Sequence, residues 1–239
     1  MTTLAVIGDV HAHFERLERV LARIEEVAPD GILLVGDLGS ADVGLCRRRT
    51  PAGDIRYRAS VTEVLDRCRA LRVPVRYVPG NHDLPDLAHP GNLDHGRDEV
   101  AGLAVAGIGG AGPAKFGFCY EWDEDTIRAR DVPACDVLLS HCPPRDTPLD
   151  RVAGRDLHVG STAIRDLALA HAGFLVCGHV HEAPGGALLG DCLCLNVGGL
   201  GAPYGRAQIG FLRRTGDLDV VWHEDLEDGT SRRWEHPRP

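Results

Sequence analysis

The sequence lacks several features that would place it in well-known classes of protein. It has no apolar run near the roughly 18 residues of a membrane-spanning helix, so we expect no membrane association. Its first nine residues have neither a basic start nor a long apolar stretch, which argues against a secretory signal and favours a cytoplasmic protein. Only one of the 26 basic residues is lysine, Lys115, which we interpret as base-composition bias without functional meaning.

Basic residues are also scarce relative to acidic ones. The 26 Lys and Arg against 35 Asp and Glu give a formal net charge of −9, and non-specific nucleic-acid binding usually relies on a basic patch. Stable binding to nucleic acid is therefore not expected. The 8 cysteines form no C-x-x-C pair, which is typical of reduced, mostly buried thiols. Cys192 and Cys194 alternate along a predicted strand and share one face, so a redox or zinc role for them stays open.

The order of apolar runs predicts an α/β protein. We predict strands at 4–8, 32–35, 75–78, 103–108, 137–139 and 174–177, and helices at 13–28, 61–71 and 162–172. Three further strands are predicted at 193–197, 207–212 and 219–223, and residues 84–97 are predicted to be a loop. A chain of 239 residues suits one domain. We assign that domain to residues 1–226 and expect a frayed polar tail at 227–239.

Five of the predicted strands are each followed by residues that commonly bind metals. In order, these are Asp9-Val10-His11, Asp37, Asn81-His82-Asp83, His141 and His179-Val180-His181. Each piece alone is common in ordinary loops and turns. Together they are informative, because binding groups gather at the carboxyl ends of strands in α/β sheets. If the backbone is extended, residues at i and i+2 point the same way, so Asp9 with His11, and His179 with His181, are each expected to be able to clamp one ion.

As a set, these motifs resemble the calcineurin-like metallophosphoesterases. The family pattern is D-x-H, G-D, G-N-H-D/E, a single His after a strand, and G-H-x-H, and all five blocks are present between residue 4 and about residue 200. The resemblance implies an α/β fold, a four-layer α-β-β-α sandwich with two packed mixed β-sheets. One local departure is Leu38-Gly39-Ser40, where many members have an acidic or Asn residue shortly after G-D.

The resemblance also implies roles for the motif residues. One metal ion would be held by Asp9, His11, Asp37 and His181, and the other by Asp37, Asn81, His141 and His179, with Asp37 bridging. His82 would contact the phosphate and protonate the leaving group. Asp83 is interpreted either as orienting the His82 ring or as a turn residue.

The chemistry of this ligand set predicts a hydrolase. Mixed N and O ligands suit two divalent ions of Mn, Fe or Zn better than Ca. Two such ions with two carboxylates leave a charge of about +2, which attracts phosphate to an acidic protein. The ions would activate a hydroxide for attack on phosphorus.

The substrate is less well defined by the sequence. We expect a small phosphoester or a nucleotide-type substrate, with a preference for phosphodiesters. The alternatives are phosphomonoesterase or protein phosphatase-type activity, and a non-catalytic scaffold on the same fold. Arg145 and His158 are candidate substrate-binding residues. The loops at 84–97, 111–122 and 143–160 are expected to choose the substrate, and the oligomeric state stays open.

Overall fold

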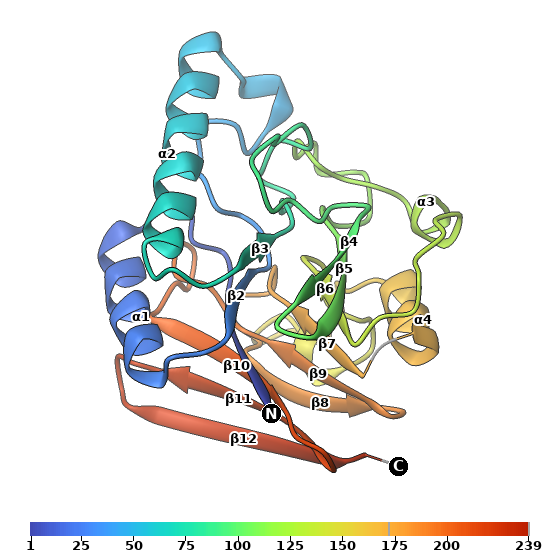
Figure 1. Cartoon of the computed structure of the whole chain (residues 1–239). Coiled ribbons are helices and arrows are strands. Elements are labelled where there is room, and N and C mark those ends of the chain that lie inside the picture. Colours follow the sequence, from blue (N-terminus) through green and yellow to red (C-terminus); the bar gives the residue numbers. More distant parts are fainter. Residues whose placement is uncertain (172, 239) are drawn as a thin grey trace.

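Two six-stranded β-sheets pack face to face, and helices cover the outer face of each (Figure 1). The computed structural model describes residues 1–171 and 173–238. In Figure 1 α1 and α2 lie on the left, α3 and α4 lie on the right, and the two sheets lie between them. The predicted four-layer α/β sandwich is confirmed.

The first sheet has the order β12-β11-β10-β1-β2-β3. Its strands are β1 (Thr2–Ile7), β2 (Gly31–Leu34), β3 (Val75–Tyr77), β10 (Gln208–Arg214), β11 (Leu218–Asp225) and β12 (Thr230–Pro237). Strands β1, β2 and β3 are parallel, and β10 to β12 add an antiparallel half. Helices α1 (Phe14–Val27) and α2 (Pro51–Arg69) lie against its outer face.

The second sheet has the order β4-β5-β6-β7-β9-β8. Its strands are β4 (Arg97–Val100), β5 (Leu103–Ile108), β6 (Val137–Ser140), β7 (Phe174–Cys177), β8 (Gly185–Leu189) and β9 (Cys192–Asn196). Its four central strands are parallel, and β4 and β8 are antiparallel edge strands. Helices α3 (Glu124–Arg128) and α4 (Thr162–His171) cover its outer face, and residue 172, where α4 was predicted to end, lies outside the described residues.

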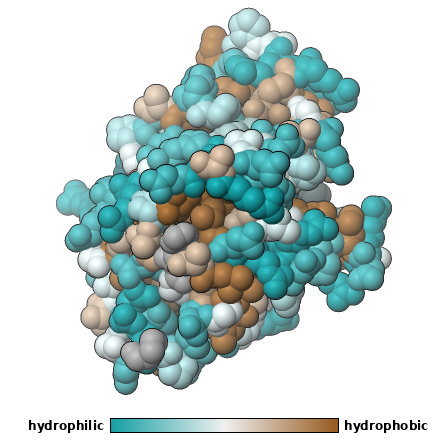
Figure 2. All heavy atoms as spheres, turned by 90° about the vertical axis from the view of Figure 1, so that its right-hand side faces the viewer, coloured by the Kyte–Doolittle hydropathy of each residue, from teal (hydrophilic) through white to brown (hydrophobic). Residues whose placement is uncertain are grey.

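Side chains alternate between the two faces of each strand, and the apolar ones form three separate cores. In β1, Leu4 and Val6 face the second sheet, whereas Ala5 and Ile7 face α1 and α2. A third core joins the second sheet to α3 and α4 and contains Cys192 and Cys194, whose sulfur atoms lie 3.9 Å apart. Successive strand residues point to opposite faces, so each strand can supply two cores at once. Seen from the α3 and α4 side, the surface is mainly hydrophilic with small hydrophobic groups (Figure 2).

Helix α2 starts about ten residues earlier than the apolar pattern predicts. Thr50 caps it by accepting a hydrogen bond from the Gly53 backbone NH at 3.0 Å, and Pro51 follows at the first helical position. A capping Thr followed by Pro is a standard helix start. The first turns bury only Gly53 and Tyr57, so they lack the apolar repeat from which the rest was predicted. Among the described residues, no helix is long and apolar enough to cross a membrane.

The expected frayed tail is wrong for residues 230–237, which form β12. This strand pairs with β11 along its whole length, from Thr230 with Asp225 to Pro237 with Leu218. The Trp234 ring packs against the glycines at the start of β8, where a side chain on Gly186 would collide with it. An edge strand exposes most of its side chains, so its sequence reads as polar. Residue 239 lies outside the described residues.

Candidate metal centre

The five motifs lie at the carboxyl ends of parallel strands from both sheets. Asp9 and His11 follow β1, Asp37 follows β2, Asn81 and His82 follow β3, His141 follows β6, and His179 and His181 follow β7. The loops are joined across the sheets, because the His179 NH donates to Asp9 Oδ2 at 3.0 Å and His141 Nδ1 donates to the Val35 carbonyl at 2.7 Å. The structure therefore brings all seven predicted ligand residues to one place, where the ends of the two sheets meet.

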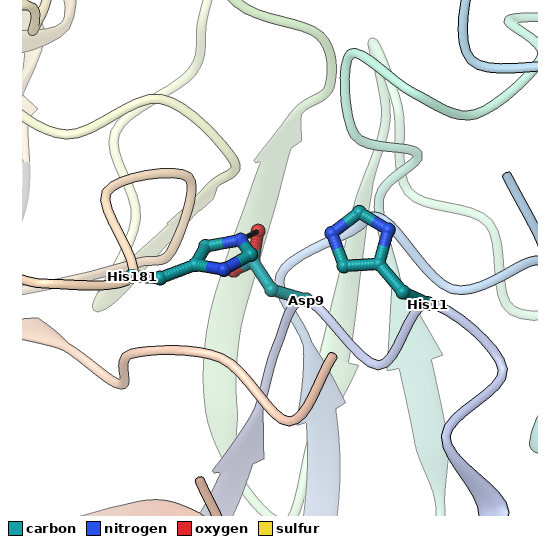
Figure 3. Close-up of side chains that lie close together, drawn as sticks. All are labelled: Asp9, His11 and His181. Atoms are coloured by element: carbon teal, nitrogen blue, oxygen red, sulfur yellow. Dashed lines mark hydrogen bonds and ion pairs between the residues drawn. The ribbon is translucent and has the colours of Figure 1, made fainter. Parts of the chain in front are cut away.

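One half of the site contains Asp9, His11 and His181, which offer ligand atoms within 4.8 Å of one another. Figure 3 shows Asp9 between the two imidazole rings. His181 Nε2 lies 2.9 Å from Asp9 Oδ1, and its Nδ1 donates to the Pro203 carbonyl at 2.6 Å. A carbonyl accepts hydrogen bonds only, so it fixes the ring with Nε2 towards the carboxylate, as is usual for a histidine that binds a metal.

The other half is built around the side-chain oxygen of Asn81. Asn81 Oδ1 lies 2.8 Å from His141 Nε2 and 2.8 Å from His179 Nδ1. His141 Nδ1 donates to the Val35 carbonyl at 2.7 Å, so a neutral His141 presents the Nε2 lone pair to the Asn81 oxygen. The Asn81 oxygen and the His141 Nε2 lone pair are both hydrogen-bond acceptors, so neither can satisfy the other, but both can bind the same cation. The donor set of this half thus fits a metal ion.

Asp37 lies between the two halves. Its Oδ2 atom is 3.7 Å from His11 Nε2 on one side and 3.6 Å from His141 Nε2 on the other. Its Oδ1 atom accepts a hydrogen bond from the His82 backbone NH at 2.8 Å. A carboxylate in this position can contribute to both halves.

The backbone at four of the predicted ligands is left-handed rather than extended. The φ angles are 49° at Asp9, 46° at His11, 52° at Asp37 and 68° at His179. The expectation that extended backbone aligns Asp9 with His11, and His179 with His181, is therefore wrong. A tight turn brings Asp9 and His11 together instead, and His179 and His181 lie in different halves of the site. Left-handed backbone at residues other than glycine costs about 1–3 kcal/mol each and clusters at functional sites, where surrounding contacts hold it.

Two motif glycines are required because the carboxylates lie against their backbone. A Cβ atom on Gly80 would collide with Asp37 Oδ1, and one on Gly178 would collide with Asp9 Oδ2. The glycines of G-N-H-D and G-H-x-H thus leave space for the two buried carboxylates. This gives a physical reason for glycine at these two places.

The charges of the site favour a cation. Burial lowers the pKa of His179 to about 3, so this ring is neutral at pH 7, and burial also lowers the pKa of His11. Burial acts to raise the pKa of Asp37, but the surrounding histidines outweigh it and the pKa is lowered. Burial likewise opposes the His181 charge, yet Asp9 raises the pKa of His181 to about 9. Burial also acts to raise the pKa of Asp9, but the contact with His181 outweighs it and the pKa is lowered. Two ionised carboxylates are thus buried among nitrogen ligands, and a metal ion would replace the proton on His181.

His82 lies beside the ligand cluster rather than within it. Its ring centroid is 5.4 Å from that of His11 and 4.3 Å from that of Phe118. The ring is partly exposed, and its backbone NH is fixed by Asp37. His82 is therefore positioned at the edge of the site that a substrate would approach.

The interpretation that Asp83 orients the His82 ring is wrong. The Asp83 carboxylate accepts hydrogen bonds from the backbone NH groups of Gly80 at 2.8 Å and Leu38 at 3.1 Å, and from the Tyr57 hydroxyl at 2.9 Å. It is fully buried, and burial with the nearby Asp37 charge raises its pKa to about 6. Asp83 thus joins the loops after β2 and β3, which is a structural role.

Arg145 and His158 lie together on the wall of a cleft of about 480 Å³ that also reaches Asn81 and His179. His158 Nδ1 is 2.6 Å from Asp150 Oδ1, whereas the Arg145 side chain is 41% exposed. Sequence reasoning missed the other cleft residues, because they belong to no motif and lie within loops that were named only as ranges. These are Ala111, Gly112, Pro113, Lys115, Phe116, Phe118, Glu121, Leu157 and Val159.

Comparison with known proteins agrees with this geometry. The family model of the calcineurin-like phosphoesterases matches residues 2–183. The chain belongs to this family. It is accordingly a metal-dependent phosphoric ester hydrolase. The match ends after the last motif, so strands β8 to β12, which complete both sheets, lie beyond it.

Solved structures share the fold over nearly the whole chain. A dimetal phosphatase from Danio rerio is 12% identical with a TM-score of 0.64, and the match covers 97% of this chain and 98% of that one. The protein TT1561 of Thermus thermophilus is 16% identical with a TM-score of 0.61, covering 98% of both chains. A predicted phosphoesterase from Streptococcus pneumoniae is 15% identical with a TM-score of 0.51, covering 99% and 98%. No curated protein matches the sequence.

Proposed function

We propose that this phosphoesterase holds two divalent metal ions and hydrolyses a phosphodiester. Asp9, His11 and His181 would hold one ion and Asn81, His141 and His179 the other, with Asp37 shared between them. The observation that carries the proposal is the convergence of these seven side chains, with Asp37 Oδ2 within 3.7 Å of a histidine of each half. The mixed N and O donors favour Mn, Fe or Zn.

The protein side chains have separate tasks in this reaction. When bound, two divalent ions neutralise phosphoryl charge and lower the pKa of a water molecule. Asp37 and Asn81 fix the geometry around the phosphoryl group. His82, at the exposed edge of the cluster, contacts the phosphate and donates a proton to the leaving oxygen. Arg145 and His158 contact the rest of the substrate, which is supported by their place in the cleft that reaches Asn81 and His179.

The charge balance of the cleft supports a diester over a monoester. Its wall carries two cationic side chains, Lys115 and Arg145, and one carboxylate, Glu121. A monoester dianion carries one more negative charge than a diester and would gain most from a cluster of cations. Among the described residues that line the cleft, there is no such cluster. A singly charged diester with bulky groups suits these walls better.

Turnover of two matched esters tests this proposal. The metal-loaded enzyme is expected to give a higher kcat/KM for bis(p-nitrophenyl) phosphate than for p-nitrophenyl phosphate with Mn(II) present. A clear preference for the monoester would instead establish the alternative of a phosphomonoesterase or protein phosphatase-type enzyme. No turnover of either ester by protein with bound metal would favour a scaffold.

We also propose a cytoplasmic location. All eight cysteines are free, and five of them are buried. Free thiols in such number are typical of reducing compartments.

A further inference from the structure

We infer that the cleft beside the metal centre binds a planar aromatic ring, so that the substrate is a nucleotide-type phosphoester whose base lies between the 111–122 and 143–160 loops. This inference rests on the proposed function, because it identifies the organic group attached to the phosphate that the metal centre would hold. The cleft of about 480 Å³ has Asn81 and His179 on its wall, so it is continuous with the metal centre.

The walls of this cleft are apolar and come from two separate loops. One loop supplies Pro113, Phe116 and Phe118, and the other supplies Leu157 and Val159. Phe116 is 59% exposed and Leu157 is 44% exposed, although most large apolar side chains of the protein are buried. Exposed apolar residues gathered at one concave place, beside convergent polar groups, are characteristic of ligand sites.

Two phenylalanine rings form an aromatic platform that ends at His82, with neighbouring rings tilted by 41° and 47° to one another. The Phe116 and Phe118 ring centroids are 6.2 Å apart, and the Phe118 and His82 centroids are 4.3 Å apart. An ester oxygen beside His82 would therefore carry its organic group over Phe118 and towards Phe116. Aromatic side chains of this kind stack on nucleobases in many proteins that bind nucleotides.

The loop that carries the platform is held in place by Glu121. The Glu121 carboxylate accepts hydrogen bonds from the backbone NH groups of Phe116 and Gly117, at 3.1 Å and 3.0 Å. Lys115 Nζ lies 5.1 Å from the Phe116 ring centroid, which adds a cation–π contact. The only lysine of the chain and the most exposed phenylalanine of the cleft are thus on one loop beside the metal centre.

The opposite wall supplies a polar atom that can recognise the edge of a base. His158 Nδ1 donates to the buried Asp150 carboxylate, whose other oxygen accepts from the Gly160 backbone NH at 3.0 Å. This contact fixes the ring, and a neutral His158 then has Nε2 as a hydrogen-bond acceptor. An acceptor on the wall of an apolar cleft matches the exocyclic amino group of a base such as adenine.

Competitive inhibition separates ring binding from phosphate binding. With bis(p-nitrophenyl) phosphate as substrate, the inhibition constants of AMP and ribose 5-phosphate are measured on the metal-loaded enzyme. Both compounds carry the same phosphate and sugar, and only AMP carries a base. AMP is expected to inhibit at about tenfold lower concentration, a preference of the size that stacking of one base supplies.

Two variants locate the preference. Phe116→Ala is expected to reduce the preference for AMP to threefold or less while the inhibition constant of ribose 5-phosphate stays the same. The matched control is Leu188→Ala, which removes a side chain 53% exposed on β8 outside the cleft, and it should keep the tenfold preference.

The outcomes distinguish this inference from the proposed function. Equal inhibition by AMP and ribose 5-phosphate, with normal hydrolysis, would overturn the inference and leave the phosphodiesterase proposal standing. A preference for AMP that Phe116→Ala leaves unchanged would also overturn it, because the base would then bind elsewhere. Loss of hydrolysis in the wild-type protein with metal bound would count against the proposed function itself.

Discussion

Asp9 and His181 contact each other at 2.9 Å although 172 residues separate them in the chain. The first follows β1 of one sheet and the second follows β7 of the other. The contact therefore depends on the packing of the two sheets, and the sandwich places the ligand residues as much as the loops do.

Substitution of His82 separates catalysis from metal binding. His82→Ala is expected to lower kcat by about 10²- to 10⁴-fold, the usual contribution of a general acid, while metal content stays unchanged. Metal content is measured by mass spectrometry beside the kinetics. The control is His236→Ala on β12, which should leave both quantities unchanged. Loss of metal from the His82 variant would show that it is a ligand instead.

The hydrogen bond from Tyr57 to Asp83 has a structural role that can be measured. Tyr57→Phe removes the donor to a buried carboxylate and also leaves the Leu84 NH, 3.1 Å from the hydroxyl, without its partner. We expect a loss of about 2 kcal/mol in the free energy of unfolding by urea. Tyr204→Phe, at a residue 65% exposed, should change it little. Unchanged stability in the Tyr57 variant would contradict the role given to Asp83.

Strand β12 should contribute to stability although its sequence is polar. Trp234→Ala removes a partly buried ring that packs against β8 and the core between the sheets, and should cost about 2 kcal/mol of unfolding free energy. Arg233→Ala on the same strand removes a side chain that is 53% exposed and forms a surface ion pair with Glu235, so it should cost well under 1 kcal/mol. If both substitutions leave the free energy of unfolding by urea unchanged, residues 230–237 would be a frayed tail and not a strand that stabilises the fold.

The sequence predicts much of the site because its ligands follow apolar strands directly. Asp9, Asp37 and His141 each stand just beyond a buried run, and the carboxyl ends of parallel strands meet at one edge of a sheet. The strands that carry a continuous apolar run could be predicted for the same reason, including β9 to β11 near the C-terminus. The left-handed turn from Asp9 to His11 could not, because it depends on contacts with other loops rather than on local residue type.

Other features of the fold and of the site leave no signal in the local sequence. The edge strands β4 and β12 expose most of their side chains and therefore show no continuous apolar run, and β8 begins with two glycines. Phe116 and Leu157 become neighbours of the metal centre only when two loops fold over it. The prediction that Asp83 orients the His82 ring is wrong because the partners of Asp83, Tyr57 and Leu38, lie far away in the sequence. Long-range contacts thus account for most of what sequence reasoning missed.

The metal content of the protein tests the central claim most directly. Protein purified without chelator should contain about two transition-metal ions per chain. Asp37→Asn replaces the shared carboxylate with a neutral amide, so it should lower the metal content and abolish hydrolysis. Asp98→Asn, which changes a carboxylate 43% exposed on β4, serves as the control and should keep both ions. Well under one ion per chain in the wild-type protein, together with no activity on adding Mn(II), would contradict the account.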